Sequence, residues 1–214
     1  MAQRISLVVL SGGRNSRMHG LNKGMLRLGE ETFLDRIYRT ARPLVSEALL
    51  VTRHPALYRK TGFRPVEDIY SLRSSLTGIH AGLTRASNQW SLVLPCDVPL
   101  VKRDLLSLLI AKAESGVDAV VPRCGTLFEP LCALYAKSCL EYADELLQAN
   151  RPKISNLFER IRLRTLEEAE LRQVDPELES FVNVNTAEDL ARLQHRCGSA
   201  RSQGVRGRLS GAES

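Results

Sequence analysis

Two glycines and several cationic side chains follow a short apolar run near the start of the chain. Gly12 and Gly13 follow this run after Ser11, and Arg17 and Lys23 lie within the next ten residues. Backbone N–H groups of a glycine-rich turn can surround an anion, and neighbouring cations add positive charge. The segment therefore predicts a phosphate-binding loop. A tight strand-to-helix turn with solvated cations is the alternative, because the segment matches neither a Walker A sequence nor a complete GxGxxG pattern.

Two carboxylates follow other apolar runs. Asp97 comes after the run 91–95 and has a proline on either side, two positions away. It is predicted to bind Mg²⁺, which prefers one or two carboxylates together with phosphate oxygens and water. Capping of the next helix is its alternative role. Asp68 could contact metal or nucleotide, or it could form a salt bridge with Arg73.

The elements that must position these residues alternate between apolar runs and amphipathic patterns. Runs rich in Val, Leu and Ile, separated by helices, are typical of a parallel sheet covered on both faces. We therefore expect a three-layer α/β/α fold with a doubly wound, mostly parallel sheet. The expected strands are 5–10, 47–52, 63–68, 91–95, 117–122 and 130–136, and the expected helices are 32–41, 75–86, 101–115, 139–149 and 186–195, the last with Thr186 as its N-cap.

In such sheets, ligands bind in the crevice at the carboxyl ends of the strands. The glycine loop follows the first strand, Thr52 and Arg53 end the second, Asp68 ends the third, and Asp97 follows the fourth. All four groups are therefore expected to face one crevice.

Composition limits the possible functions. The chain has 214 residues and a formal net charge of +6, and only 5% of its residues are aromatic. We expect one domain over 1–197, followed by a tail, 198–214, too poor in apolar residues to fold. The longest cationic cluster, 160–164, alternates as in an ordinary strand, which argues against nucleic-acid binding and favours a small polyanionic substrate.

The cysteines and the apolar segments favour a cytoplasmic protein without a membrane span. No apolar run approaches the roughly 20 residues that a transmembrane helix needs. The five cysteines show no zinc-binding spacing and are expected to be reduced, and most of them buried. They are Cys96, Cys124, Cys132, Cys139 and Cys197.

The segment LSGGRNSRMHGLNK, residues 10–23, resembles the signature of the molybdenum cofactor guanylyltransferase family. His19 stands where that family usually has glycine, and Asn22 where aspartate is common. Five later segments resemble family segments in the same order. They are VED at 66–68, SSLTGIHAGL at 74–83, LPCDVPLV at 94–101, EPLCALY at 129–135 and FVNVNTAEDL at 181–190.

This resemblance implies transfer of GMP from GTP to the terminal phosphate of molybdenum-molybdopterin, with Mg²⁺ as cofactor. It implies that Arg17, Lys23 and Asp97 are catalytic and that Asp97 binds the metal. The implied GTP-binding residues are Leu10, Ser11, Gly12, Gly13, Lys23, Thr52, Asp68, Gly78 and Asp97. Thr52 replaces an asparagine that is common in the family.

Asn183 and Asn185 are the implied molybdopterin-binding residues. They alternate along the chain, so in an extended segment they point the same way, and their amides suit the heteroatoms of a pterin. Asn185 could instead cap the final helix. The segment EPLCALY resembles the one that faces this second substrate.

Three other functions stay open at this point. A cytidylyltransferase is less favoured because its relatives more often have alanine before the second glycine of the loop. A sugar-1-phosphate nucleotidyltransferase would share the fold but not the segments 129–135 and 181–190. A non-catalytic accessory protein could bind nucleotide or cofactor and dock on a molybdoenzyme or its chaperone, which are also the possible protein partners of an active enzyme.

Overall fold

The computed structural model describes residues 4–11, 17–18 and 21–196. The expected tail, 198–214, lies outside these residues, as do Gly12 and Gly13 of the glycine loop. None of the helices in the described ranges has the length and apolar character needed to cross a membrane.

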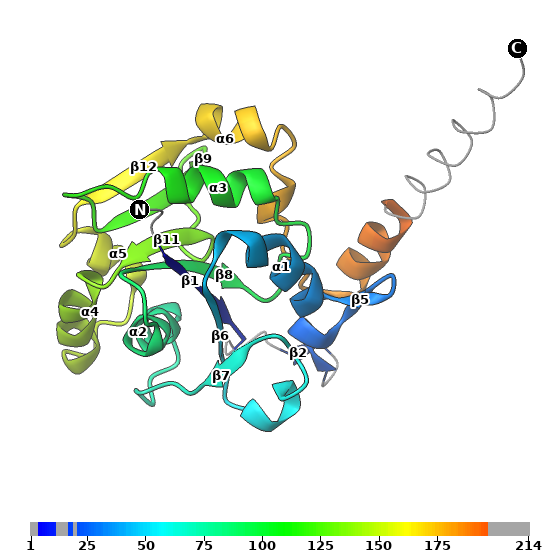
Figure 1. The fold of residues 1–214 in the computed structure, drawn as a ribbon, viewed down its shortest axis with the longest axis horizontal. Coiled ribbons are helices and arrows are strands. Elements are labelled where there is room, and N and C mark those ends of the chain that lie inside the picture. The colour runs from blue at the N-terminus through cyan, green and yellow to red at the C-terminus, as the bar shows by residue number, and fades with distance from the viewer. Residues whose placement is uncertain (1–3, 12–16, 19–20, 197–214) are drawn as a thin grey trace, which may run out of the picture.

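An eight-stranded sheet with helices on both faces forms the body of the described chain (Figure 1). The strand order is β10-β9-β11-β8-β1-β6-β7, with β12 also paired to β9. Strands β8, β1, β6 and β7 are parallel, and β11 runs antiparallel between β8 and β9. The bounds are β1 Ile5–Leu10, β6 Glu47–Val51, β7 Arg64–Val66, β8 Trp90–Pro95, β9 Ala119–Cys124, β10 Leu127–Phe128, β11 Ala133–Ala136 and β12 Leu163–Glu167.

Two layers of helices cover the sheet, which confirms the predicted three-layer fold (Figure 1). One layer contains α1 (Phe33–Ala41), α3 (Arg103–Ala111) and α6 (Glu168–Val174), and the other contains α2 (Ser75–Arg85), α4 (Cys139–Gln148) and α5 (Ile154–Phe158). Alternate residues of β1 face the two layers, as the side-chain period of a strand requires. Leu7 and Val9 pack in the first core cluster, and Val8 packs in the second.

Helix α2 lies unusually close to the central strand. A Cβ atom at Gly82 would lie 2.3 Å from Cγ1 of Val8, so only glycine permits this approach without movement of the strand. The amino end of α2 is thereby held at the carboxyl edge of the sheet.

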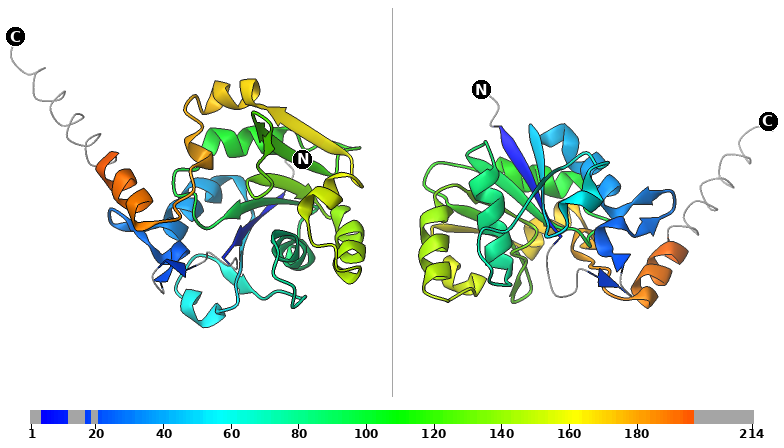
Figure 2. Two further views of the ribbon diagram at one scale, coloured as in Figure 1. Left: turned by 180° about the vertical axis from the view of Figure 1, so that it is seen from behind. Right: turned by 90° about the horizontal axis from the view of Figure 1, so that it is seen from below.

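A small third cluster joins the residues after the glycine loop to the last described helix, 187–196 (Figure 2). Its core consists of Leu26, Leu28, Phe33, Val184 and Leu193. Thr186 caps this helix as predicted, since its Oγ1 accepts a hydrogen bond from the Asp189 N–H at 3.1 Å. The short strands nearby are β2 Arg17–Met18, β3 Leu21–Asn22, β4 Arg27–Leu28 and β5 Glu31–Thr32. The 3₁₀ turns among the described residues are Lys23–Met25, Arg42–Leu44, Pro55–Tyr58 and Glu179–Phe181.

The predicted central elements match the observed ones to within a few residues. Helices α5 and α6 and the two-residue strands were not predicted, and for β12 only the alternation of 160–164, which overlaps its first two residues, pointed to a strand. In β12 only Leu166 is fully buried, so its sequence lacks the continuous apolar run of the central strands. Helices α5 and α6 have five and seven residues, too short to show a clear helical period.

The described cysteines agree with the expectation of reduced thiols. Four of them are free, and three of these, Cys96, Cys132 and Cys139, are buried. Burial raises the pKa of the Cys96 thiol to about 12, and that of Cys139 to about 12, so both are protonated at neutral pH. Cys197 lies outside the described residues.

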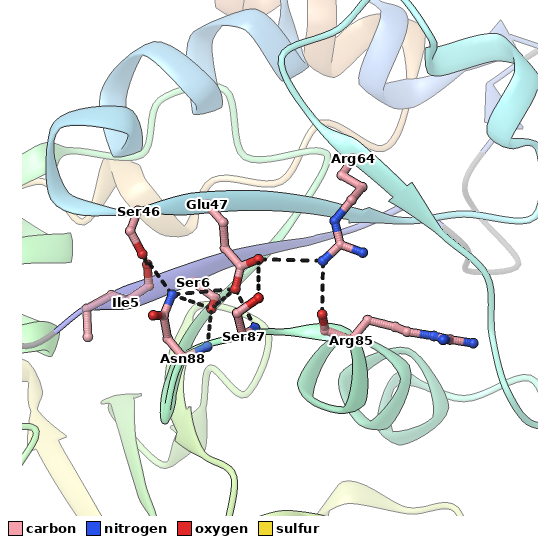
Figure 3. Close-up of polar contacts among 8 residues, drawn as sticks. All are labelled: Ile5, Ser6, Ser46, Glu47, Arg64, Arg85, Ser87 and Asn88. Carbon is pink, nitrogen blue, oxygen red and sulfur yellow. Dashed lines mark hydrogen bonds and ion pairs between the residues drawn. The ribbon is translucent and has the colours of Figure 1, made fainter.

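A polar cluster ties the strands together at their amino ends, opposite the expected crevice (Figure 3). The Ser6 hydroxyl of β1 donates to Glu47 of β6 at 2.6 Å, and the Ser87 N–H donates to the same carboxylate at 2.5 Å. Arg64 of β7 lies 3.5 Å from Glu47. Burial acts to raise the pKa of Glu47, but the hydrogen bonds from Ser6 and Ser87 outweigh it, so the pKa is lowered overall.

We predict that Glu47→Gln destabilises the protein by about 1–2 kcal/mol at pH 7, because an amide nitrogen would then face hydrogen-bond donors. Since the folded-state pKa of Glu47 is lowered, its contribution is complete above the unfolded pKa and is lost as pH falls through the folded pKa. Urea denaturation from pH 7 to pH 3 should show the difference from wild type shrinking. The exposed control Glu114→Gln should change little, and a pH-independent difference would contradict this account.

Candidate active site

A pocket of about 560 Å³ lies at the carboxyl ends of the central strands. Strand β1 leads through α1 to β6 on one side, whereas β8 leads through α3 toward β9 on the other. The pocket therefore lies at the topological switch point, where doubly wound folds bind ligands. Its lining includes Leu10, Lys23, Arg53, Asp68, Arg73, Ser74, Gly78, Asp97, Glu129, Pro130, Leu131, Cys132, Phe181, Asn183 and Asn185.

Lys23 occupies the centre of this site and is almost completely buried, with 2% of its surface exposed. Its Nζ donates to Oδ1 of Asn185 at 2.6 Å and to Oδ2 of Asp97 at 3.2 Å. A buried ammonium group is tolerated only where it is paired and hydrogen-bonded. Lys23 thus joins three segments that are far apart in the sequence: the end of the glycine loop, the end of β8 and the segment 183–185.

Asp97 faces Lys23 and does not cap a helix. Helix α3 begins at Arg103, and its N-cap residue is Lys102. The Asp97 side chain is 18% exposed, so one side of the carboxylate remains open to the pocket. The helix-cap alternative for Asp97 is therefore wrong.

The segment 183–185 is anchored to Asp97 through the backbone. The Val184 N–H donates to the Asp97 carbonyl at 2.9 Å, and this places Asn183 and Asn185 at the pocket. The Asn185 side chain accepts from Lys23, while Thr186 caps the following helix. Asn185 is therefore a residue of the site and not the side-chain cap of the last helix.

A second anchor lies just before this segment. Asp175 is fully buried and accepts hydrogen bonds from the Ser180 N–H at 2.8 Å and from Lys102, whose Nζ lies 2.7 Å away. Burial acts to raise the pKa of Asp175, but these partners outweigh it and lower the pKa. The carboxylate stays ionised and fixes the turn that leads into 183–185.

Asp68 lies at the β7 end of the pocket and pairs with a different arginine from the one predicted. Its Oδ2 is 3.4 Å from Nε of Arg53, so Arg53 rather than Arg73 is its partner among the described residues. Burial raises the pKa of Asp68, and the arginine only partly opposes this shift. Arg73 lines the pocket separately and leaves a cationic side chain available for an anion there.

Two of the predicted GTP-binding side chains are turned away from the pocket. The hydroxyl of Ser11 lies 3.0 Å from that of Tyr58, and both side chains are buried. Thr52 is also buried, and its Oγ1 accepts from the His54 N–H at 3.1 Å. Neither side chain lines the described pocket, so only their backbone groups could contact a nucleotide.

The remaining predicted residues divide into those at the pocket and those the structure does not describe. Gly12 and Gly13 lie outside the described residues, and the side chain of Arg17 does as well, although its backbone pairs with Asn22. The structure does bring the other predicted residues together at the pocket. They are Leu10, Lys23, Asp68, Gly78, Asp97, Asn183 and Asn185.

Two charged residues of the pocket had no role there assigned from the sequence: Arg73, which was considered only as a partner of Asp68, and Glu129, of which only the segment EPLCALY was considered. Arg53 follows the end of β6 and lines the pocket, as predicted for the residues that end the second strand. Burial raises the pKa of Glu129, which opens the segment EPLCALY. Within the described chain no group of three or more His, Cys, Asp or Glu side chains could hold a metal ion by protein ligands alone.

Residues 7–166 match the family model of the MobA-like NTP transferase domain. The chain belongs to this family. Among curated members, the molybdenum cofactor guanylyltransferase of Desulfosudis oleivorans is 35% identical over 87% of this chain and 93% of its own. A probable molybdenum cofactor guanylyltransferase of Methanosarcina mazei is 33% identical over 88% of this chain and 89% of its own.

Solved structures of MobA-like and related proteins share the fold. Molybdopterin-guanine dinucleotide biosynthesis protein A of Archaeoglobus fulgidus has a TM-score of 0.78 and 28% identity, covering 91% of this chain and 99% of that one. The 4-diphosphocytidyl-2C-methyl-D-erythritol synthase of Anaerococcus prevotii, at 14% identity and a TM-score of 0.68 over 92% of this chain and 97% of that one, shows the fold alone. The family model and the curated relatives show that this MobA-like chain is a nucleotidyltransferase.

We predict that Asp97→Asn destabilises the metal-free protein by about 1–3 kcal/mol, because it leaves the buried Lys23 ammonium without a counter-charge. The double variant Lys23→Met/Asp97→Asn removes both charges and should recover part of this loss. Urea denaturation in a chelating buffer measures both. An additive double variant, or an Asp97→Asn protein as stable as wild type, would show that the ion pair contributes nothing to folding.

Proposed function

We propose that this MobA-like enzyme transfers GMP from GTP to the terminal phosphate of molybdenum-molybdopterin and releases pyrophosphate. The observation that supports this most is the buried Lys23, held between Asp97 and Asn185 where the two expected substrate sites meet. The names of the curated relatives agree with this reaction.

The nucleotide would bind over the glycine loop and the β1 side of the pocket. Lys23 and Arg17 would hold its phosphates, and Arg73 adds positive charge at the same edge. Asp68 would lie beside the nucleoside. The amides of Asn183 and Asn185 would contact molybdopterin on the other side of Lys23, so that the two phosphate groups meet at one cation.

The attacking phosphate oxygen does not need a general base to remove a proton from it. A phosphate monoester has a second pKa of about 6, so the acceptor is already largely a dianion at pH 7. Histidine is absent from the described lining of the pocket, which is consistent with this. The acceptor oxygen attacks the α-phosphorus in line and the bond to pyrophosphate breaks. The protein accelerates this step by holding two anions together and neutralising their charge.

The donor set of the pocket fits a magnesium ion that is completed by substrate. Asp97 has one partly exposed carboxylate, and Mg²⁺ commonly takes one or two carboxylates, with phosphate oxygens and water as its other ligands. Asp97 would hold the ion, which supplies charge neutralisation at the phosphates when bound. The contact with Lys23 orients the Asp97 carboxylate in the free enzyme.

We further propose that the enzyme acts in the cytoplasm and delivers its product to molybdoenzymes or their chaperones. A reduced state of the buried thiols fits this location.

We predict selectivity for GTP over CTP and ATP. Calorimetric titration of each nucleotide with Mg²⁺ should give at least tenfold tighter binding of GTP. Pyrophosphate release in the presence of molybdenum-molybdopterin should follow the same order. If CTP binds as tightly as GTP, the chain is a cytidylyltransferase of the same fold. If GTP binds without turnover, it is an accessory protein.

We predict that Asp97→Asn lowers the rate of pyrophosphate release by roughly 10²-fold or more, since several kcal/mol of transition-state stabilisation depend on the metal site. The rate should be measured against Mg²⁺ concentration at a temperature where the variant is folded. Wild-type activity of the variant at ordinary Mg²⁺ would place the metal elsewhere, with Asp68 as the next carboxylate to test.

A further inference from the structure

Glu129 is the carboxylate of the pocket that neither the fold nor the reaction accounts for. It lies between β10 and β11, at the opposite end of the pocket from Asp68, with β8 and β1 between them. Its backbone N–H is bonded to the Pro122 carbonyl at 2.9 Å, so the residue is fixed in place. Its side chain is partly buried and makes no hydrogen bond or ion pair within the described residues.

This placement is costly unless a ligand compensates it. A carboxylate withdrawn from water without a partner is destabilising, and burial raises the pKa of Glu129 accordingly. Both substrates of the proposed reaction carry phosphate, and molybdopterin also carries sulfur ligands to its metal. An unpaired carboxylate would repel all of these groups, so it must face a part of a substrate that presents hydrogen-bond donors.

Guanine and the pterin ring each have such an edge, and the place of Glu129 at the end of the pocket opposite Asp68 favours the pterin. Its 2-amino group and the adjacent ring N–H are two donors side by side, and a carboxylate can accept one hydrogen bond on each oxygen. The pocket also suits the rest of the ring, because Leu131, Cys132 and Phe181 add apolar surface to the same lining as Glu129. The asparagines 183 and 185 lie in the same lining, within the segment that follows Phe181.

We propose that Glu129 binds the 2-amino-4-oxopyrimidine edge of the pterin substrate and thereby selects the acceptor of the reaction. This rests on the proposed function, and it assigns a binding residue to the acceptor half of the pocket. The apolar side chains contact the ring, and Glu129 accepts hydrogen bonds from its 2-amino group and ring N–H. The phosphate end of the molecule points toward Lys23.

The first test separates the two substrates kinetically. For Glu129→Gln, the KM for molybdenum-molybdopterin should rise at least tenfold, while the calorimetric Kd for GTP stays within twofold of wild type. Glu114→Gln is the matched control, and thermal denaturation checks that each variant is folded. An unchanged KM for molybdopterin would overturn the proposal, and an equal loss of GTP affinity would place Glu129 on the nucleotide side.

The second test measures recognition of the 2-amino group directly. Pterin and lumazine differ in that lumazine carries a carbonyl oxygen in place of the 2-amino group. As competitors of molybdenum-molybdopterin, pterin should inhibit the wild-type enzyme more strongly than lumazine does. A glutamine amide offers one acceptor and one donor, so Glu129→Gln should shift the preference toward lumazine by tenfold or more. The same preference in both proteins would overturn the proposal.

Failure of this proposal is distinguishable from failure of the proposed function. If wild-type protein releases no pyrophosphate from GTP and molybdenum-molybdopterin, the function is wrong. If the wild type turns over and neither the KM nor the pterin preference depends on Glu129, only the assignment of Glu129 is wrong.

Discussion

The arrangement of the site depends on one buried cation. Lys23 comes from the end of the glycine loop, yet its two partners lie after β8 and near the last described helix. Because an unpaired ammonium group cannot stay buried, the three segments must converge for the chain to fold. In the proposed reaction, the same convergence would bring the nucleotide side of the pocket against the acceptor side. The contacts that allow these segments to fold are therefore the same contacts that form the pocket.

The sheet supplies the frame on which this convergence is possible. Strands β1 and β8 lie side by side and in parallel, so Leu10 and Pro95 end at the same level. Gly82 lets α2 lie against β1, and the polar cluster around Glu47 fixes the other end of the strands. The amino ends of the strands are held together by the cluster around Glu47, whereas their carboxyl ends line the pocket. Doubly wound folds usually bind their ligands at the carboxyl ends in this way.

The sequence was sufficient to predict the parts of the molecule that repeat a strong local pattern. Strands β1 and β8 are buried over all but their last residue, and β6 is buried over its last three residues, so their sequences are mostly apolar on both faces. It was also sufficient for residues that follow these strands, such as Asp97, and for the segment that contains Asn183 and Asn185. It was not sufficient for β12, an edge strand with one fully buried residue, because half-exposed strands resemble loops in sequence.

The sequence was also not sufficient to predict which side chains pair when they are far apart along the chain. The partner of Asp68 depends on how β6 and β7 lie together, so Arg53 and Arg73 could not be distinguished from spacing alone. Likewise, Ser11 and Thr52 stand at strand ends, where residues of the crevice are expected. The side-chain alternation of a strand nevertheless turns both hydroxyls into the protein, toward Tyr58 and the His54 N–H.

The distribution of charge in the pocket explains why its carboxylates can coexist with anionic substrates. Asp97 and Asp68 each lie beside a cation, Lys23 and Arg53, so neither presents an uncompensated negative charge to a phosphate. Glu129 has no such cation among the described residues, and it stands farthest from the nucleotide end. In a pocket for two polyanions, a carboxylate in that position is compatible with binding only where the acceptor offers donors. In the proposed reaction this charge pattern would orient the acceptor: its phosphate would meet the cations at the centre, and its donor-rich ring would lie at the edge near β11.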